Sequence, residues 1–140
     1  MIHFAPEAAL SRNIRQQRYF TSYLTADMFM PGVDFHADLQ SLPFESDSFD
    51  FFICSHVLEH VPDDRKAIRE LHRITRPGGS GLLMTPVDSA IETTLEDLSI
   101  TNAGERWRLF GQDDHLRLYS HDDYVDRIKE SGFSLQQLAQ

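Results

Sequence analysis

The chain has 140 residues, of which 41% are hydrophobic and 25% are charged, and its formal net charge is −9 at pH 7. This length suits one domain with a single core, and the composition excludes a disordered chain. The negative charge opposes binding to a nucleic-acid backbone, and no apolar run approaches the roughly 20 residues that cross a bilayer. We therefore expect a folded protein whose partner is a small molecule or another protein, with no nucleic acid and no membrane.

The sequence also bears on localisation. Met1–Glu7 has neither a basic segment nor an apolar core, so it does not resemble a signal peptide. The single cysteine, Cys54, lies in an apolar run, which is typical of a buried, reduced thiol. Three arginines at 12, 15 and 18 have helical spacing and are expected to form a solvated helix face. The start of the chain and the reduced cysteine predict a cytoplasmic protein, and the arginine face gives no reason to expect nucleic-acid binding.

Short apolar runs alternate with amphipathic stretches along the whole chain, which favours an α/β fold with a mainly parallel sheet. Phe51–Cys54 is apolar without interruption, as in a strand that is covered on both faces. We expect one domain, residues 1–140, with a doubly wound Rossmann-like sheet of about six strands. The predicted strands are residues 2–5, 22–26, 33–37, 51–54, 82–84 and 133–138.

Helices are predicted between the strands. Pro6 suits the first turn of one helix, and Ser120 with Asp123 forms an S-x-x-D capping signal for another. Residues 88–119 are polar and irregular, and we expect a lid or an acceptor-binding segment there, with a helix near 102–109. The predicted helices are residues 6–18, 62–75, 102–109 and 120–131.

Ligands of doubly wound sheets bind at the carboxyl ends of the strands, near the point where the strand order reverses. Asp27 follows the second predicted strand and lies 20 residues after Glu7, a spacing at which a carboxylate can hold both hydroxyls of a ribose. Asp38 follows the third strand. The alternative is that both aspartates only end their strands, because aspartate is common in turns.

The middle of the chain carries a family resemblance. Val33–Asp50, continued by Phe51–Val61, and later Ile68–Gly79 followed by Leu82–Met84, resembles the class I S-adenosylmethionine-dependent methyltransferases of the type 11 group. The resemblance is strong over about residues 33–87 and weak over residues 1–32. It implies S-adenosyl-L-methionine as the cofactor and methyl transfer to an acceptor, which we expect to be a small molecule.

The resemblance also implies residue roles. Asp27 would hold the ribose, Asp38 would accept from the adenine amino group, and Leu39 would pack beside the base. Ser55 and His56 would lie near the methionine part. Ala5, Pro6 and Glu7 would occupy the place of the turn after the first strand. His60 and His115 would face the acceptor, and either could be the catalytic base because histidine titrates near neutral pH. No residue is assigned to a metal in this interpretation.

One competing motif is present. His56–His60 matches H-x-x-E-H, a metalloprotease pattern in which His56, Glu59 and His60 would serve a metal-dependent hydrolase. That chemistry needs both histidines on one face of a continuous helix, plus a further ligand. Here the motif directly follows a strand, and Pro62 comes two residues after it, so the methyltransferase interpretation is favoured.

The chain also departs from the family. It has no glycine before Gly32, and Ala5 is not expected to adopt a positive φ. Met28–Gly32 is too short for a crossover helix, so one sheet face and a sheet edge are expected to be exposed. We therefore expect a homodimer or a partner chain covering them. A shortened binding or interaction module without turnover is the second interpretation.

Overall fold

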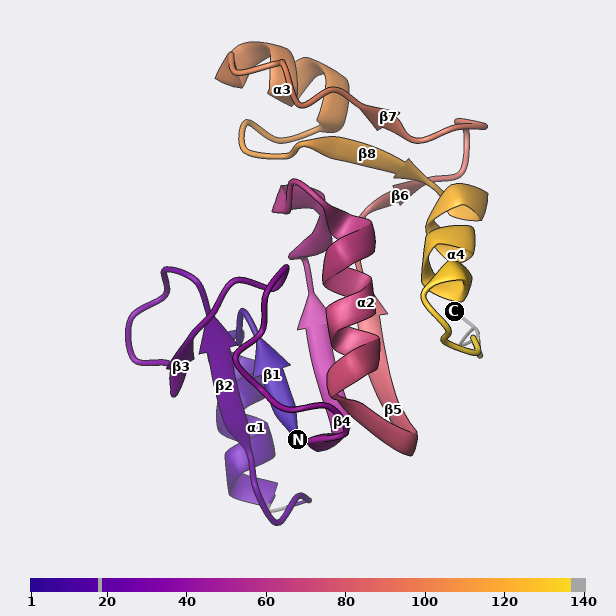
Figure 1. The fold of residues 1–140 in the computed structure, drawn as a ribbon. Coiled ribbons are helices and arrows are strands. Elements are labelled where there is room, and N and C mark those ends of the chain that lie inside the picture. Colours follow the sequence, from indigo (N-terminus) through magenta and orange to yellow (C-terminus); the bar gives the residue numbers. More distant parts are fainter. Residues whose placement is uncertain (18, 137–140) are drawn as a thin grey trace.

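The computed structural model describes residues 1–17 and 19–136. A five-stranded parallel sheet with the order β3-β2-β1-β4-β5 forms its centre, and the helices lie on both faces (Figure 1). This confirms the predicted α/β, doubly wound class, with five strands in the main sheet rather than about six. The strands are β1 (Ile2–Phe4), β2 (Leu24–Asp27), β3 (Phe35–His36), β4 (Phe49–Ser55) and β5 (Thr75–Met84).

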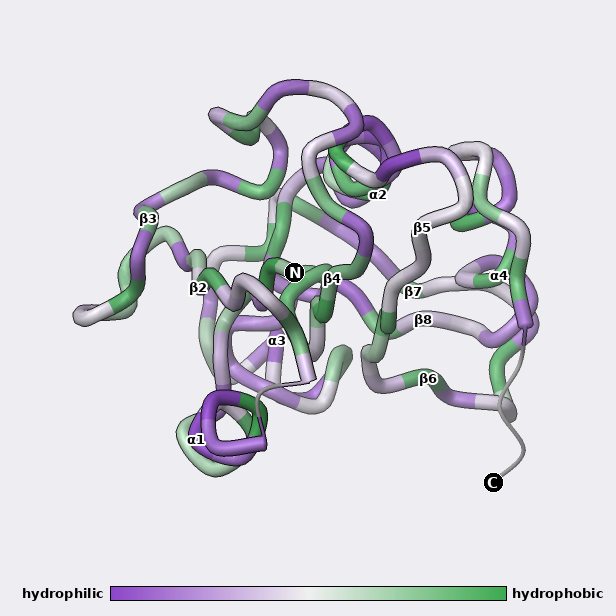
Figure 2. Tube along the Cα trace, turned by 90° about the horizontal axis from the view of Figure 1, so that it is seen from below, coloured by the Kyte–Doolittle hydropathy of each residue, from purple (hydrophilic) through white to green (hydrophobic). Residues whose placement is uncertain are grey.

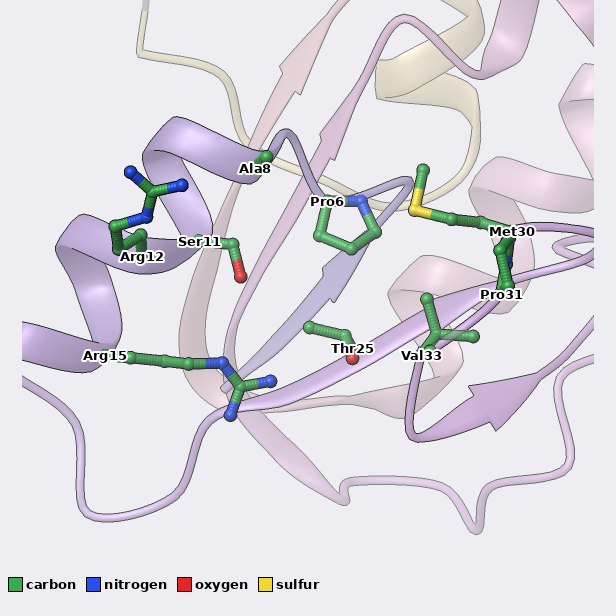
Figure 3. A pocket seen from close by; sticks show the side chains of 10 residues that line it. Pro6, Ala8, Ser11, Arg12, Arg15, Thr25, Met30, Pro31 and Val33 are labelled. Atoms are coloured by element: carbon green, nitrogen blue, oxygen red, sulfur yellow. The ribbon is translucent and has the colours of Figure 1, made fainter.

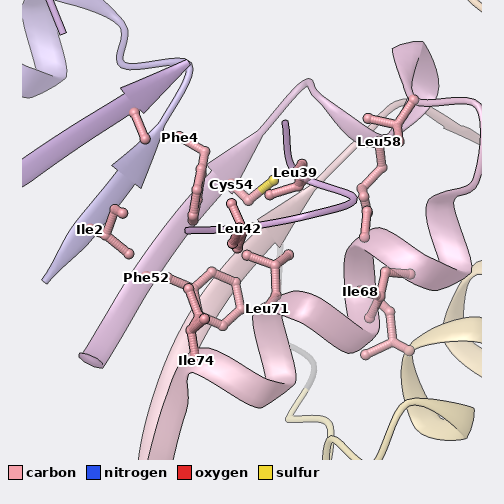
Figure 4. Close-up of a cluster of buried hydrophobic side chains, with 14 of the residues drawn as sticks. Ile2, Phe4, Leu39, Leu42, Phe52, Cys54, Leu58, Ile68, Leu71 and Ile74 are labelled. Atoms are coloured by element: carbon pink, nitrogen blue, oxygen red, sulfur yellow. The ribbon is translucent and has the colours of Figure 1, made fainter. Parts of the chain in front are cut away.

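The main core lies between the sheet and α2 (Asp64–Ile74). Asp63 caps this helix by accepting a hydrogen bond from the backbone of Lys66, at 2.9 Å. Figure 2 shows the largely hydrophobic β4 between α1 (Ala8–Gln17) and α2. The apolar positions of α2 recur at helical spacing and are buried against alternate residues of β1 and β4 (Figure 4). These core residues are Ile2, Phe4, Phe52, Cys54, Ala67, Ile68, Leu71 and Ile74.

The opposite face is covered by α1 (Ala8–Gln17), whose buried residue Ile14 packs on Met1 and Ile53. Phe20 stacks on Phe51 with a centroid distance of 5.7 Å. This second cluster is much smaller than the main core because no helix joins β2 to β3. The predicted absence of a crossover helix is thus confirmed for this part of the chain.

Residues 28–34 connect β2 to β3 without a helix. So short a parallel connection is feasible because β3 has only two residues, which pair with Ala26 and Asp27, so the chain retraces little distance. Asp34 holds the connection in place. Its Oδ2 accepts from the backbone N–H and the hydroxyl of Thr25, both at 2.8 Å, and these bonds lower the pKa of Asp34.

Residues 88–119 are more ordered than the sequence suggested. They contribute to a second sheet with the order β6-β8-β7 and to a helix, all beyond the carboxyl ends of the main strands (Figure 1). Asn102 caps the helix and Gly111 ends it with a φ of 85°. We call these elements the cap segment. They are β6 (Val87–Asp88), β7 (Leu95–Glu96), α3 (Ala103–Phe110) and β8 (Arg117–Ser120).

One buried arginine attaches the cap segment to the main sheet. Arg117 of β8 is 2% exposed, and its guanidinium donates to three backbone carbonyls of the turn that follows β4: Leu58, Val61 and Pro62. Its Nε also donates to Glu96 at 3.0 Å. The backbone N–H of Leu116 donates to the carbonyl of Glu59 at 2.8 Å, so side chain and main chain bind the same turn.

The last helix, α4 (His121–Glu130), packs beside α2. Ser120 is its N-cap by position, but its hydroxyl makes no capping hydrogen bond and is buried without a partner among the described residues. The helix thus begins where the S-x-x-D signal predicted it, but the expected capping hydrogen bonds are absent from the described residues, and Asp123 instead accepts a hydrogen bond from Arg127 at 3.0 Å. The final strand predicted at 133–138 does not form over residues 133–136, and 137–138 lie outside the described residues.

Candidate functional site

The site is built where β1 and β4 lie side by side, the point at which the strand order reverses. Each of these two strands is followed by a residue in the left-handed region: Ala5 has a φ of 48° and His56 a φ of 54°. The expectation that Ala5 avoids a positive φ was wrong. Its N–H donates to the carbonyl of Ala26 at 2.9 Å, so pairing with β2 holds the turn in this conformation. Such strain on both sides of a switch point is typical of a ligand site.

The turn after β1 is tied to a buried histidine. His3 is fully buried, and its ring lies 2.8 Å from the hydroxyl of Tyr23 and 3.1 Å from the carboxylate of Glu7. Burial lowers the pKa of His3, although Glu7 opposes the shift. Burial alone would raise the pKa of Glu7, but hydrogen bonding and the charge of His3 together lower it. Phe4 pairs with Cys54, so the turn that carries Glu7 begins beside Ser55, at the carboxyl ends of two neighbouring strands.

Asp27 ends β2 beside the Ala5 turn. Its Oδ1 accepts from the backbone N–H groups of Phe29 and Met30, at 2.7 and 2.6 Å. This is the turn role that the sequence left as an alternative, and it also fixes the direction of the carboxylate. Only Oδ1 is used in these bonds, so Oδ2 stays available to a ligand hydroxyl. The structural role and the binding role are therefore compatible.

Asp38 lies next to Asp27 in space, because the N–H of Ala37 donates to the carbonyl of Asp27 at 3.1 Å. Its carboxylate accepts from the backbone and side chain of Gln40, at 2.9 and 3.1 Å. Leu39 is only 6% exposed and belongs to the main core. Its side chain therefore offers little surface for packing beside an adenine.

The second half of the site lies under the cap segment. Glu59 and His60 belong to a short 3-10 helix, η1 (Leu58–His60), which is separated from the end of β4 by two residues. His115 reaches them from the loop before β8. The rings of His60 and His115 meet edge to face with a centroid distance of 4.8 Å. The structure therefore brings together the two histidines that the sequence assigned to the acceptor, although they are far apart in the chain.

Glu59 lies beside the two histidines of this group, and the methyltransferase interpretation of the sequence gave it no role. It is 1% exposed; Oε2 accepts from the hydroxyl of Thr85 at 2.9 Å, and Oε1 has no hydrogen-bond partner among the described residues. His56 lies 3.3 Å from Oε1, but its ring is 63% exposed. An almost buried carboxylate with an unused oxygen is costly unless a ligand satisfies it. The sequence contained a signal, since Glu59 lies inside the H-x-x-E-H motif.

The geometry does not provide what the hydrolase motif requires. The helix that follows β4 has three residues, and His56 precedes it with a left-handed backbone, so the two histidines of the motif do not share a continuous helix. Glu59 and His60 group instead with His115, which is not part of the motif.

A groove of about 420 Å³ lies elsewhere, between α1 and the connection from β2 to β3 (Figure 3). Arg12 and Arg15 border it from the helix, Thr25 from the strand, and Met30 and Val33 from the connection. It occupies the sheet face that a crossover helix would cover. Of the predicted cofactor residues only Pro6 lines it, so this groove is not the predicted cofactor site.

Comparison with known proteins identifies the family. Residues 7–83, more than half of the chain, match the type 11 methyltransferase-domain family. A demethylmenaquinone methyltransferase of Staphylococcus epidermidis is 43% identical over 44 residues, which are 31% of this chain and 18% of that protein. The crystal structure of a putative methyltransferase from Bacillus halodurans has a TM-score of 0.68 at 18% identity, over 97% of this chain and 59% of that one.

A further solved structure, an S-adenosylmethionine-dependent methyltransferase from Mesorhizobium loti, has a TM-score of 0.65 at 17% identity and covers 97% of this chain and 74% of that one. These structures confirm the methyltransferase fold, and the family match confirms the expected cofactor class, S-adenosyl-L-methionine. No helix among the described residues is long and apolar enough to cross a membrane. The chain is a member of the type 11 family of methyltransferase domains.

Proposed function

We propose that this chain binds S-adenosyl-L-methionine across the carboxyl ends of β1, β2 and β4 and transfers its methyl group to a small-molecule acceptor held beneath the cap segment. The observation that carries the proposal is the pair of left-handed turns at Ala5 and His56, which flank the strand-order switch point. These turns expose backbone at the place where doubly wound folds bind their ligands.

The side chains around this point fit the cofactor. Asp27 has one oxygen fixed by its own turn and one left for a ribose hydroxyl. Asp38 lies beside it and can accept from an amino group of the base. Glu7 carries a negative charge next to Ser55 and can pair with the ammonium of the methionine part. The left-handed Ala5 reproduces the backbone shape that a glycine would give.

When bound, the cofactor supplies a methyl group on a positively charged sulfur. The protein orients the acceptor, excludes water and removes a proton where the acceptor carries one. His60 is partly exposed beside His115, which places two imidazoles where an acceptor proton can be taken. The cap segment closes this end of the sheet and would exclude water, in keeping with the predicted lid role of residues 88–119.

The acceptor is proposed to be a small organic molecule that is methylated at oxygen, nitrogen or carbon. The charge of −9 and the pairing of each buried arginine, Arg117 and Arg127, with carboxylates disfavour a polyanion. The similarity to a demethylmenaquinone methyltransferase and to a 2-methyl-6-phytyl-1,4-hydroquinone methyltransferase of rice makes quinones and hydroquinones classes to include in an acceptor panel.

We further propose self-association through the β3 edge. Exposed apolar side chains gather there: Met28, Phe29 and Met30 in the connection, and Phe35 on the strand. Phe29 is 82% exposed, which is costly in water unless another chain covers it. Light scattering after size exclusion should show a dimer that Phe29→Asp dissociates, whereas a monomer at high concentration would contradict the proposal. The cytoplasmic location stays a prediction.

Calorimetric titration with S-adenosylmethionine and with its demethylated product tests the central proposal. We expect binding by the wild type, and weakening of at least about tenfold by Asp27→Ala, since a charge-assisted hydrogen bond contributes about 1.5–3 kcal/mol. Asp50→Ala is the matched control, because this exposed aspartate pairs with Arg76. Absence of binding by the wild type would refute the enzyme interpretation for this chain. Binding without turnover across the acceptor panel would favour the interaction module.

A further inference from the structure

We propose that Glu59, His60 and His115 form a binding site for a divalent transition-metal ion, with Zn²⁺ as the probe. One carboxylate oxygen of Glu59 and one ring nitrogen of each histidine lie within 4.8 Å of one another. Two imidazoles and a carboxylate are a ligand set that suits zinc and its neighbours in the first transition row. The 3-10 helix supplies two of the ligands, and the loop before β8 supplies the third.

The unused oxygen of Glu59 is an independent sign that this cluster binds something. Glu59 is 1% exposed, and its Oε1 accepts no hydrogen bond in residues 1–17 and 19–136; its one ion-pair contact there is with Nδ1 of His56, at 3.3 Å, whose side chain is exposed and could be replaced by a metal ion. A buried carboxylate is normally paired, hydrogen-bonded or bound to a metal. Thr85 already satisfies Oε2, so a cation beside Oε1 would complete the environment of this side chain.

The contacts around the histidines are those of metal ligands. Nδ1 of His115 lies 3.1 Å from the carbonyl of Phe110, which can only accept, so Nδ1 carries the proton and Nε2 keeps its lone pair. Nδ1 of His60 lies 3.3 Å from a carboxylate oxygen of Asp114. Metal-binding histidines usually hold their second nitrogen against a carbonyl or a carboxylate in this way.

The proposed metal site lies at the same end of the sheet as the proposed acceptor site, and this inference rests on the proposed function. It gives the two histidines a different role, that of metal ligands instead of bases. As ligands they no longer accept a proton. Three protein ligands leave at least one coordination position, which a water molecule or an acceptor hydroxyl can fill, and a bound cation lowers the pKa of that group. The cofactor residues Asp27 and Asp38 are not part of the cluster, so the two proposals can be tested separately.

The test is a zinc titration of the whole chain after treatment with a chelator, in competition with a chromophoric ligand of known affinity. We expect one Zn²⁺ per chain. His60→Ala should lower the affinity at least about 100-fold, because even the groups that hydrogen-bond to metal ligands contribute about 10–100-fold. His121→Ala is the matched control, since this exposed histidine also contacts an aspartate. Circular dichroism confirms that each variant folds.

A second measurement uses Co²⁺, whose visible absorption reports its ligands, with Glu59→Gln as the variant. A band that Glu59→Gln and His60→Ala abolish supports the site. Failure of the wild type to bind Zn²⁺, or zinc binding that His60→Ala leaves unchanged, overturns it. Cofactor titration of the same metal-free sample distinguishes this failure from failure of the methyltransferase proposal, because it should succeed whether or not the cluster binds metal.

Discussion

The left-handed turn at Ala5 leads to a prediction about stability. An L-residue in this region costs about 1–2 kcal/mol because its Cβ crowds the following carbonyl, and glycine avoids that cost. Glycine in turn loses about 0.5–1 kcal/mol more backbone entropy on folding than alanine does. At Ala5, with its φ of 48°, the steric cost of the left-handed conformation is larger than the entropic cost that glycine would add. We therefore expect Ala5→Gly to raise the free energy of unfolding by about 0.5–1 kcal/mol.

The matched control is Ala9→Gly. Ala9 is an exposed alanine in α1, where glycine has only the entropic cost, so this variant should lose about 0.5–1 kcal/mol. Urea unfolding of the three proteins, with equal m-values, measures both changes. Destabilisation of Ala5→Gly by as much as Ala9→Gly would show that the left-handed turn is not strained, and strain at Ala5 would then no longer point to a ligand site.

Three further predictions concern the contacts that hold the site in place. Arg117→Leu should lower the free energy of unfolding by about 3–5 kcal/mol, because Arg117 lies 3.8 Å from the buried carboxylate of Asp64 and its loss would leave that charge with one partner fewer. Arg12→Leu, on an exposed helix face, should change the free energy of unfolding by no more than about 0.5 kcal/mol. Asp34→Ala should lower the free energy of unfolding in urea by about 1–2 kcal/mol, because the backbone N–H and the hydroxyl of Thr25 lose their acceptor. Asp34→Asn, which keeps an acceptor oxygen, should lower it by no more than Asp34→Ala does. Hydrogen bonds from Arg127 and Arg117 lower the pKa of Glu96 to about 2, so its ion pairs stabilise the folded state above pH 4.5 and cease to do so as the pH falls towards 2. The free energy of unfolding in urea, measured from pH 5 to pH 3, should therefore change less in Glu96→Gln than in the wild type.

The sequence predicted β4 and α2 correctly, because in each of them a single hydrophobic pattern was enough to identify the element. The continuous apolar run at 51–54 and the helical spacing of Ala67, Ile68, Leu71 and Ile74 both correspond to buried elements in the structure. The predicted ends of the strands were less accurate, because pairing with a neighbouring strand decides where a strand begins. The fifth strand was predicted to begin at residue 82, but β5 begins at Thr75, which pairs with Phe49 of β4; after an irregularity in the register, Ser80 pairs with Phe51.

The cap segment could not be predicted because its strands are too short for a periodic signal. β6 and β7 have two residues each, and they exist as strands only through pairing with β8. The left-handed Ala5 was missed for a related reason. Intrinsic preference opposes a positive φ for alanine, and the tertiary hydrogen bond to Ala26 outweighs that preference.

His115 meets Glu59 and His60 because of its neighbours, not because of its own contacts with them. The N–H of Leu116 donates to the carbonyl of Glu59, and Arg117 donates to the carbonyls of Leu58 and Val61, so two successive residues fix the loop that carries His115. A lysine at position 117 would keep the charge but not the planar fork that reaches several carbonyls at once. In Arg117→Lys we therefore expect zinc affinity to fall while cofactor affinity stays near the wild-type value, because Asp27 ends β2 and Asp38 lies in the turn after β3, and the hydrogen bonds of Arg117 go to other parts of the chain. Equal losses in both affinities would mean that this arginine supports the whole fold rather than the geometry of the histidine cluster.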